Sequence, residues 1–474
     1  MTDLLRVSSP RGRRALAATI LGSSMVFLDS TIANVATKRI GQEFHASFGS
    51  LQWVLNGYML PLASLILLGG SLGDLLGRRR VYVVGVIGFA VASALCAVAP
   101  NVGALVAARA LQGLAGALLT PGSLALITSM FDEEDRGKAV GSWSGLSSVS
   151  TAIGPFVGGW LVEHVSWRWA FGINLPLAVA VLLLVSAVPE SRSAAAPKRP
   201  DVLGTVLIAL GLGALTFGTT SAGDGGWDAA ALGTTVAGAA LVVAFVLIEI
   251  HSRHPLVPPT LFADRTFSAA NAMTFCTYGA LSAALFVLVL HLQSSAGYGP
   301  LAAGVATLPI TLLLIGLSSR AGAIAARIGP RLPLTIGPLL AAVGLLLTLR
   351  LDADHRNYLL YVLPGVILFG LGMATLVAPL TASVMASAPA SEVGIASGVN
   401  NAVARSASLL TVAVLPPLAG LRGDAYEHAA AMTHGYRVVT LLCIALLVIG
   451  AMVVALSIRP APLDTATRTE PAER

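Results

Sequence analysis

Apolar runs of about 20 residues recur from one end of this sequence to the other, and each is long enough to span a bilayer as a helix. Only 11% of the 474 residues are charged. Soluble domains carry about 25% charged residues, so most of this surface cannot face water. The sequence therefore excludes a soluble enzyme, a nucleic-acid-binding module and a disordered chain, and it predicts an all-α integral membrane protein.

The runs predict fourteen transmembrane helices joined by short loops, with no room for a folded soluble domain. They cover residues 14–36, 50–71, 81–99, 103–127, 138–162, 167–188, 202–221, 228–250, 267–292, 300–319, 332–350, 358–382, 394–416 and 434–457. Two longer polar stretches, 189–201 and 251–265, divide them into six, two and six helices. We therefore expect an N-terminal six-helix bundle at 14–188, a two-helix insert at 202–250 and a C-terminal six-helix bundle at 267–457.

Basic residues predict the orientation in the membrane. With the amino terminus inside, twenty of the 29 lysines and arginines fall on the inner side, seven fall on the outer side and two lie within spans. The positive-inside rule then places both termini in the cytoplasm, for a multi-pass protein of the inner (plasma) membrane. The net charge of +6 reflects topology and headgroup contact, because no basic face with interleaved aromatic residues points to nucleic acid.

The two six-helix groups echo each other in their glycines. Glycines seven apart recur in the second-to-third and tenth-to-eleventh loops, and glycines four apart open the fifth and thirteenth helices: Gly70 and Gly77, Gly322 and Gly329, Gly137 and Gly141, Gly394 and Gly398. Duplicated halves that rock about a shared central site are a transporter architecture. The pattern predicts two pseudo-symmetric halves around one cavity.

Three ionisable residues lie inside the predicted spans, where each costs at least ~2.5 kcal/mol and so marks function by default. Asp29 in the first span and Arg109 in the fourth lie at similar depths, which allows them to share one aqueous cavity. A carboxylate that alternates between a dry environment and a neighbouring arginine can take up and release a proton. Asp29 is therefore the candidate proton carrier and Arg109 its partner; the alternative is a buried ion pair that only fixes two helices.

The third intramembrane charge, Arg405, lies in the thirteenth span beside Asn400 and Asn401. No acidic residue within the C-terminal spans neutralises it. We expect Arg405 and the two asparagines to line the central cavity, where they would meet carbonyls, water or an anionic group of a substrate. The equally open alternative is an arginine that hydrogen bonds to helix backbone or to a neighbouring helix.

The loop between the second and third spans combines glycines with charges. Gly70 and Gly77 permit a tight turn, Asp74 can cap the next element or pair with a basic side chain, and Arg78 and Arg79 lie at the inner leaflet. An acidic cluster at 132–135 ends the fourth span on the same side. These groups suggest a cytoplasmic latch that forms and breaks during transport, whereas a solvated run of charge is the alternative for the cluster.

The fifth span is rich in glycine and carries one proline. Gly154, Pro155, Gly158 and Gly159 combine a face that a neighbouring helix can approach closely with a bend in the axis, which favours a sliding or hinging contact. The chain has no phosphate-binding loop that ends in Gly-Lys-Ser/Thr and no cluster of nucleophile, base and acid. Its histidines are dispersed and its three cysteines lie in apolar segments, so we expect no enzyme activity, no cofactor and no bound metal.

These residues resemble the motifs of the major facilitator superfamily, and specifically of its fourteen-helix drug:proton antiporters. The matching positions are Leu28, Asp29, Thr31, Asn34 and Ala36 in the first helix, Gly70, Leu72, Asp74, Gly77, Arg78, Arg79 and Arg80 in the inner loop, Arg109, Gln112, Gly113 and Gly116 in the fourth helix, and Gly154, Pro155, Gly158 and Gly159 in the antiporter motif. The run 52–58 is also similar to the second helix of that branch, and the C-terminal half matches mainly by span count, position and the stretch 396–401.

The resemblance implies the major facilitator fold and the export of small amphipathic drugs or antibiotics, by alternating access, in exchange for protons. It also implies a monomer in the lipid bilayer that uses the proton gradient rather than ATP. It adds Asn34, Asn56, Tyr58 and Gln112 to the candidates for contact with substrate.

Two departures from the family pattern affect these expectations. Thr37 and Lys38 replace the usual Leu-Pro after the first-helix motif, and Ala326 replaces the aspartate in the second copy of the inner loop, so a latch there would be asymmetric. The C-terminal spans also lack the acidic residues that some exporters of dications carry, which favours neutral, monocationic or zwitterionic substrates. Dedicated export of one endogenous metabolite or lipid is the main alternative function, and proton-driven uptake is a further one.

Overall fold

The computed structural model describes residues 4–192, 201–252, 257–389 and 392–458, and leaves out most of one predicted linker and part of the other. Within these residues all fourteen predicted spans are helical. The helices are α1 (Pro10–Phe44), α2 (Phe48–Leu76), α3 (Arg78–Ala97), α4 (Val102–Met130), α5 (Glu133–His164), α6 (Trp169–Gly172) with α7 (Asn174–Leu184), α8 (Val202–Gly225), α9 (Ala229–His251), α10 (Arg265–Ser294), α11 (Pro300–Ala306) with α12 (Leu308–Ile328), α13 (Arg331–Thr348), α14 (Leu363–Ala386), α15 (Val393–Leu418) and α16 (Ala429–Ser457). The all-helical membrane fold predicted from the sequence is confirmed.

The helix boundaries differ from the predicted spans in informative places. Helix α1 continues to Phe44 instead of ending at residue 36, because the polar residues beyond that point find partners in the protein. Lys38 donates from Nζ to the carbonyl of Gln293 at 2.6 Å, for example. The predicted tenth span is divided into α11 and α12 at Thr307, two residues before Pro309, whose ring cannot continue the hydrogen-bond pattern of the preceding turn.

Composition separates one helix from the others. Thirteen spans in the described chain are long and apolar enough to cross a membrane on length and composition alone. Helix α15 is not among them because its first half carries Asn400, Asn401 and Arg405 between short runs of small residues. A polar helix in a membrane bundle needs partners or an aqueous surface, so α15 is expected to face the interior of the molecule.

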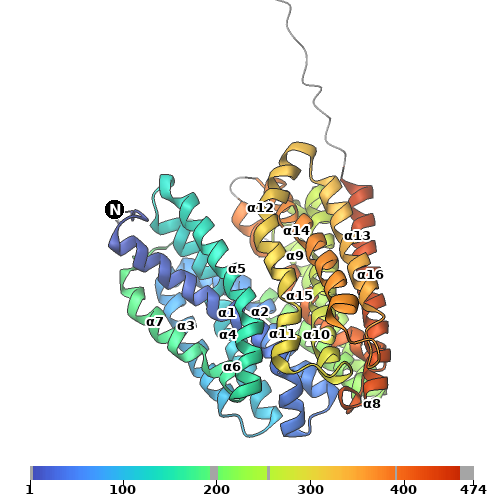
Figure 1. Ribbon diagram of the computed structural model, residues 1–474. Helices are drawn as coiled ribbons and strands as arrows, with labels where there is room; N and C mark the ends of the chain where they lie inside the picture. The colour runs from blue at the N-terminus through green and yellow to red at the C-terminus, as the bar shows by residue number, and fades with distance from the viewer. Residues whose placement is uncertain (1–3, 193–200, 253–256, 390–391, 459–474) are drawn as a thin grey trace, which may run out of the picture.

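The helices form two halves that stand side by side (Figure 1). We call the end of the bundle at which α1 begins and α16 ends the terminal face, and the opposite end the distal face. Helices α1 to α7 enclose two apolar clusters, and α10 to α16 enclose a third, to which the distal ends of α1 and α2 contribute. In Figure 1 the ribbons of the two halves diverge toward the terminal face and meet toward the distal face.

Contacts between the halves are concentrated near the distal face. The backbone N–H of Leu301 in α11 donates to the Glu163 carboxylate of α5 at 2.9 Å, and the Tyr426 hydroxyl donates to the Ala46 carbonyl at 2.9 Å. Toward the terminal face, by contrast, Gly137 and Gly141 of α5 have no neighbouring atom within 4 Å of where a Cβ would stand. The described structure is therefore closed at the distal face and open at the terminal face.

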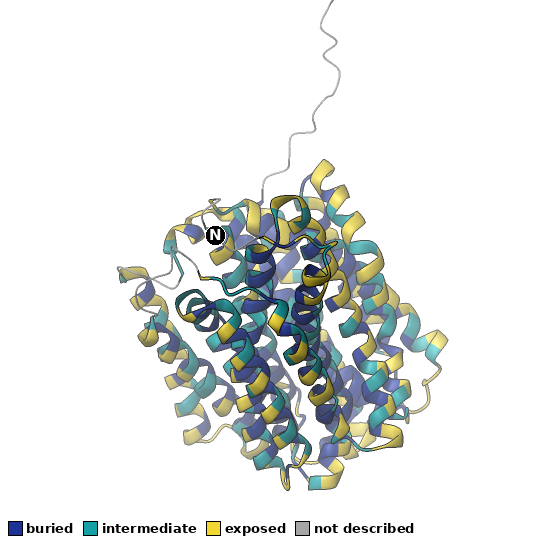
Figure 2. Cartoon of the chain, turned by 90° about the vertical axis from the view of Figure 1, so that its left-hand side faces the viewer, coloured by how far each residue is buried: buried dark blue, intermediate teal, exposed yellow. Residues whose placement is uncertain are grey.

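The outer surface of the bundle is apolar. Leu183 and Leu360 are 74% and 69% exposed, as expected for side chains that meet lipid rather than water. Figure 2 shows exposed positions along the outward sides of the long helices and buried positions between the helices.

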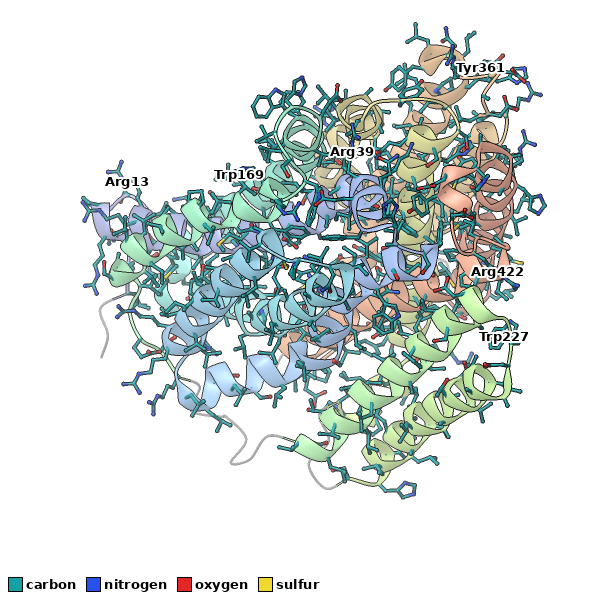
Figure 3. The ribbon with its side chains drawn as sticks, turned by 90° about the horizontal axis from the view of Figure 1, so that it is seen from below. Arg13, Arg39, Trp169, Trp227, Tyr361 and Arg422 are labelled. Carbon is teal, nitrogen blue, oxygen red and sulfur yellow. The ribbon has the colours of Figure 1, made fainter. Side chains whose placement is uncertain are left out.

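The insert lies at the periphery of the bundle. Helix α8 packs on α2 and α15, and α9 packs mainly on α8. Figure 3, which views the distal face, shows this pair beside the two halves, with Trp227 at its turn. Trp53 of α2 and Phe217 of α8 form an aromatic contact with ring centroids 6.4 Å apart. The insert therefore covers one side of the junction between the halves, and its α9 presents side chains such as Val236 and Val243 to the surroundings.

Candidate functional site

Two of the three intramembrane charges form an ion pair inside the N-terminal half. Arg109 of α4 donates from Nη1 to Oδ2 of Asp29 in α1 at 2.5 Å. Both residues are only 1% exposed. A buried pair of this kind needs further hydrogen bonds to offset the loss of water, and such bonds surround both partners.

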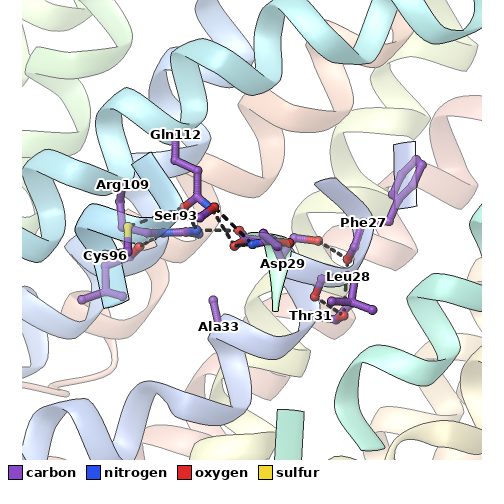
Figure 4. A network of polar contacts seen from close by, with 12 residues as sticks. Phe27, Leu28, Asp29, Thr31, Ala33, Ser93, Cys96, Arg109 and Gln112 are labelled. Carbon is purple, nitrogen blue, oxygen red and sulfur yellow. Dashed lines mark hydrogen bonds and ion pairs between the residues drawn. The ribbon is translucent and has the colours of Figure 1, made fainter. Parts of the chain in front are cut away.

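Polar side chains from three other helical positions complete the network (Figure 4). Gln112 donates from Nε2 to Asp29 Oδ1 at 2.8 Å and accepts from Arg109 Nη1 at 2.6 Å. Asn174 of α7 also donates to Asp29 Oδ1, at 3.1 Å. The Ser93 hydroxyl oxygen of α3 accepts from Gln112 at 2.8 Å and from Asn174 at 3.3 Å. Three helices, α1, α4 and α7, thus meet at the Asp29 carboxylate, and α3 joins the network through Ser93.

Arg109 has contacts beyond the carboxylate. Its Nε donates to the backbone carbonyl of Val54 in α2 at 3.0 Å. Its guanidinium lies 4.3 Å from the ring centroid of Tyr58 and 5.5 Å from that of Phe171, within the range of cation–π attraction. Arg109 is therefore also held by contacts that do not involve Asp29.

The structure places Asp29, Arg109 and Gln112 together but in a dry interior. The sequence suggests an aqueous cavity around the charges and a substrate-contact role for Gln112. In the described conformation Gln112 is 0% exposed and its amide is fully engaged with the charge network. The reason is the close packing of α2 and α4: a Cβ at Gly113 would stand 2.1 Å from the carbonyl oxygen of Tyr58.

Sequence reasoning missed two members of the network, Ser93 and Asn174. A serine or an asparagine in a span is less costly than a charge and passes as ordinary helix packing. The available signal is that Asn174 is an amide within an otherwise apolar sixth span. Such an amide needs a partner, and an unpaired carboxylate in another helix of the same half is the natural one.

A second polar group lies where the two halves face each other. Arg405 of α15 is partly buried, its Nε has no hydrogen-bond partner, and no ion pair to it occurs among the described residues. Tyr58 of α2 is fully buried, and its hydroxyl also lacks a partner. Arg405 interacts electrostatically with Tyr58 and with Tyr278 of α10. The alternative that neighbouring carbonyls satisfy Arg405 therefore finds no support in the described part of the chain.

The other predicted cavity residues are divided between this region and the protein interior. Asn400 donates to Thr274 Oγ1 at 2.7 Å and to Asn271 Oδ1 at 3.2 Å, and Asn401 is exposed. Both line a cavity of about 100 Å³ whose walls also include Tyr278 and Ala404. Asn34 and Asn56 each leave one buried amide atom without a partner.

The glycines of α5 allow two close helix contacts. A Cβ at Gly154 would stand 1.9 Å from Thr31 Oγ1, and one at Gly158 would stand 2.9 Å from Ile32, so this face of α5 fits against α1. Gly159 faces the other half, where a Cβ would lie 2.6 Å from Leu301 Cα. Pro155 lies between these contacts, inside α5. Glycine is required on both sides because there is no space for a side chain.

The inner loop is tied to its own half. Gly77 adopts φ +113° between α2 and α3, a conformation open to glycine. Asp74 accepts from Arg78 Nε at 2.8 Å, Arg78 donates from Nη1 to the Ala125 carbonyl of α4 at 3.2 Å, and the backbone N–H of Arg79 donates to Glu190 at 3.0 Å. The acidic cluster at 132–135 does not meet this loop; Asp135 pairs with Lys138 and Asp132 lies 3.7 Å from Arg6. Gly70 lies in α2 against Pro121.

Comparisons with known proteins agree with this architecture. The family model of the Major Facilitator Superfamily matches residues 19–412. The tetracenomycin C resistance and export protein of Streptomyces glaucescens is 36% identical over 88% of this chain and 78% of its own length. The puromycin resistance protein of Streptomyces alboniger is 34% identical over 94% and 90%, and the multidrug resistance protein Stp of Mycobacterium tuberculosis is 36% identical over 84% and 74%.

A solved structure supports the fold independently. The crystal structure of a D-xylose-proton symporter superimposes with a TM-score of 0.67 over 94% of this chain and 98% of that one, at 14% sequence identity. Identity at this level speaks for the fold alone. With a family match across most of its length and a relative that is 36% identical over 88% of it, the chain belongs to the major facilitator superfamily.

Proposed function

We propose that the protein exports small amphipathic compounds, antibiotics and other drugs among them, in exchange for protons. The observation that carries the proposal is the buried Asp29–Arg109 pair with its shell of amide donors, one carboxylate at which three helices meet. The relatives named for resistance to tetracenomycin C and puromycin, and for multidrug resistance, support export of such compounds.

The charge distribution supports a cytoplasmic location for the terminal face. Twenty of the 29 basic residues lie on that side by sequence, so we place both termini in the cytoplasm and the chain, as a monomer, in the plasma membrane. The open terminal face then corresponds to the state that loads substrate from the cytoplasm or the inner leaflet. The opposite state would open the distal face after the contacts between α5 and α11 separate.

The proton step follows from the network around Asp29. Protonation removes the carboxylate's negative charge and weakens its attraction to Arg109, while Val54, Gln112 and Tyr58 continue to hold the arginine. Helix α1 is thereby released from α4 and can shift against it. Because α1 also packs on α5, whose outer part contacts α11, the change in charge is coupled to the contact between the halves. The proton gradient, and no bound nucleotide, would supply the energy.

Relatives named for one antibiotic favour a second candidate, dedicated export of a single endogenous product. A panel of dyes and antibiotics in proteoliposomes with an imposed pH gradient separates the two. Substrate-linked proton movement for several unrelated compounds indicates polyspecific efflux, and movement for one compound indicates a dedicated exporter. Absence of proton movement with every compound would contradict proton-driven transport.

A further inference from the structure

The three intramembrane charges do not cancel. Asp29 and Arg109 neutralise each other within the N-terminal half. Arg405 has no such partner among the described residues. The acidic residues of the C-terminal half lie outside the long helices α10 to α16: they are Asp352, Asp354, Glu392, Asp424 and Glu427. The middle of the molecule therefore carries one uncompensated positive charge at the interface between its halves.

A buried charge without a partner is unfavourable unless a ligand or water interacts with it. Arg405 Nε is inaccessible to solvent and without a hydrogen-bond partner, so the position is costly in the absence of a ligand. The side chain therefore has hydrogen-bonding capacity that no described residue of the protein satisfies.

A cavity of about 100 Å³ lies next to Arg405 along α15. Its lining includes Ala404, the residue before Arg405, and Tyr278 of α10. Asn401 lies one helical turn nearer the terminal face on α15 and offers an amide to the same space. Apolar Val384 and Met385 complete the wall. The lining suits an amphipathic molecule with an acceptor group at one end.

We propose that Arg405 binds an anionic oxygen of the substrate, either a carboxylate or an ionised phenol or enol, and that the protein exports anionic or zwitterionic amphipaths in preference to cations. The proposal rests on the export function above and names its substrate class. Arg405 supplies a positive charge and N–H donors in a fixed geometry. A monocationic compound, which the sequence alone leaves open, would meet a like charge here.

The test compares two dyes that share a xanthene ring system and differ in charge, fluorescein as the anion and rhodamine 123 as the cation. Binding to the purified full-length protein in nanodiscs is measured by fluorescence polarisation. We expect wild type to bind fluorescein at least tenfold more tightly than rhodamine 123. We expect Arg405→Gln to weaken fluorescein binding at least tenfold without weakening rhodamine 123 binding.

Two further variants separate recognition from folding. Arg405→Lys keeps the charge but loses the guanidinium geometry, so it should retain part of the affinity. Arg327→Gln removes an exposed arginine near the terminal face of α12 and should change neither dye. Thermal unfolding of each variant checks that the protein is intact. Fluorescein binding that is undetectable, or that is unchanged in Arg405→Gln and Arg405→Lys, would overturn the proposal.

Failure of this inference is distinguishable from failure of the export function. If a pH gradient drives rhodamine 123 across proteoliposomes while fluorescein does not bind, proton-coupled export stands and the anion site is wrong. If fluorescein binds through Arg405 but no gradient moves either dye, the anion site stands and proton coupling is wrong.

Discussion

The two halves of the molecule are both bundles of helices, but their intramembrane charges are arranged differently. In the N-terminal half, Asp29 and Arg109 are 1% exposed and joined to each other, to the Gln112 amide of α4 and to the Asn174 amide of α7. In the C-terminal half, Arg405 stands at the interface without an ion-pair partner in the described chain. One half holds a buried ion pair, where we propose the proton step, and the other holds an arginine without an ion-pair partner, where we propose the ligand site.

This difference teaches why the two roles are separable. The Asp29–Arg109 pair lies in a closed shell of side chains, so the proton step proposed for it needs the surrounding helices to move. Arg405 is only partly buried and lies next to a cavity along α15. Each of the following predictions either removes the contrast between the halves or measures it.

The largest effect is expected for Asp29→Asn. The amide cannot take up and release a proton, so export driven by a pH gradient should fall at least 100-fold while dye binding changes only a few-fold. Transport of a dye in proteoliposomes, measured with and without the gradient, gives both quantities. Asp354→Asn, at an exposed position between α13 and α14, is the matched control and should behave as wild type. Full gradient-driven export by the Asp29→Asn protein would contradict the proposal that Asp29 carries the proton.

The second-largest effect is expected on stability, when Arg109 is replaced. Arg109→Gln leaves a buried carboxylate without its cation, which costs about 3–5 kcal/mol. The double variant Asp29→Asn, Arg109→Gln leaves no unpaired charge and should recover much of that loss. Thermal unfolding in detergent of wild type, the two single variants and the double variant gives a double-mutant cycle. Additive losses in the double variant would show that the two residues are not energetically coupled.

The contact between the halves should respond to a single methyl group. Gly159→Ala places a Cβ 2.6 Å from Leu301 Cα, so it should disfavour the closed distal face by about 1–3 kcal/mol. Gly141→Ala, on the same helix, meets nothing within 4 Å and is the control. A cysteine introduced at the exposed position Asn401 reports opening of the terminal face through its labelling rate, because the three native cysteines are buried. Equal rates in both alanine variants would contradict the assigned contact.

The smallest effect concerns charges outside the membrane. The backbone N–H of His355 donates to Asp352 at 2.9 Å and lowers the pKa of that carboxyl. A lowered pKa stabilises the folded protein above the usual value of about 3.9, and this stabilisation is lost as the pH falls through the lowered pKa. Asp352→Asn should therefore reduce the unfolding temperature slightly at pH 6, and this difference should shrink as the pH falls below about 3.9. A difference of the same size at every pH would exclude ionisation as its cause.

Sequence reasoning predicts the fold well because a bilayer allows few alternatives. An apolar run of the right length becomes a helix, and the rarity of charges in such runs singles out Asp29, Arg109 and Arg405. The pairing of Asp29 with Arg109 is also suggested by their depths. The roles of Ser93 and Asn174 could not be predicted, because a small polar residue in a span has many structural uses. The direction in which the molecule opens depends on contacts between distant segments, such as Glu163 with Leu301, that no local pattern encodes.

The unpaired positive charge of Arg405 has an electrical consequence. If each cycle carries one monoanion outward and one proton inward, both movements transfer positive charge into the cell. At a membrane potential of 100 mV, negative inside, two charges correspond to ~4.6 kcal/mol, enough for roughly a 2,000-fold substrate gradient without any difference in pH. A monocation exported by the same exchange would transfer no net charge and could draw only on the pH difference. The positive charge of Arg405, through the anionic substrates that it selects, would thus decide whether the membrane potential contributes to export.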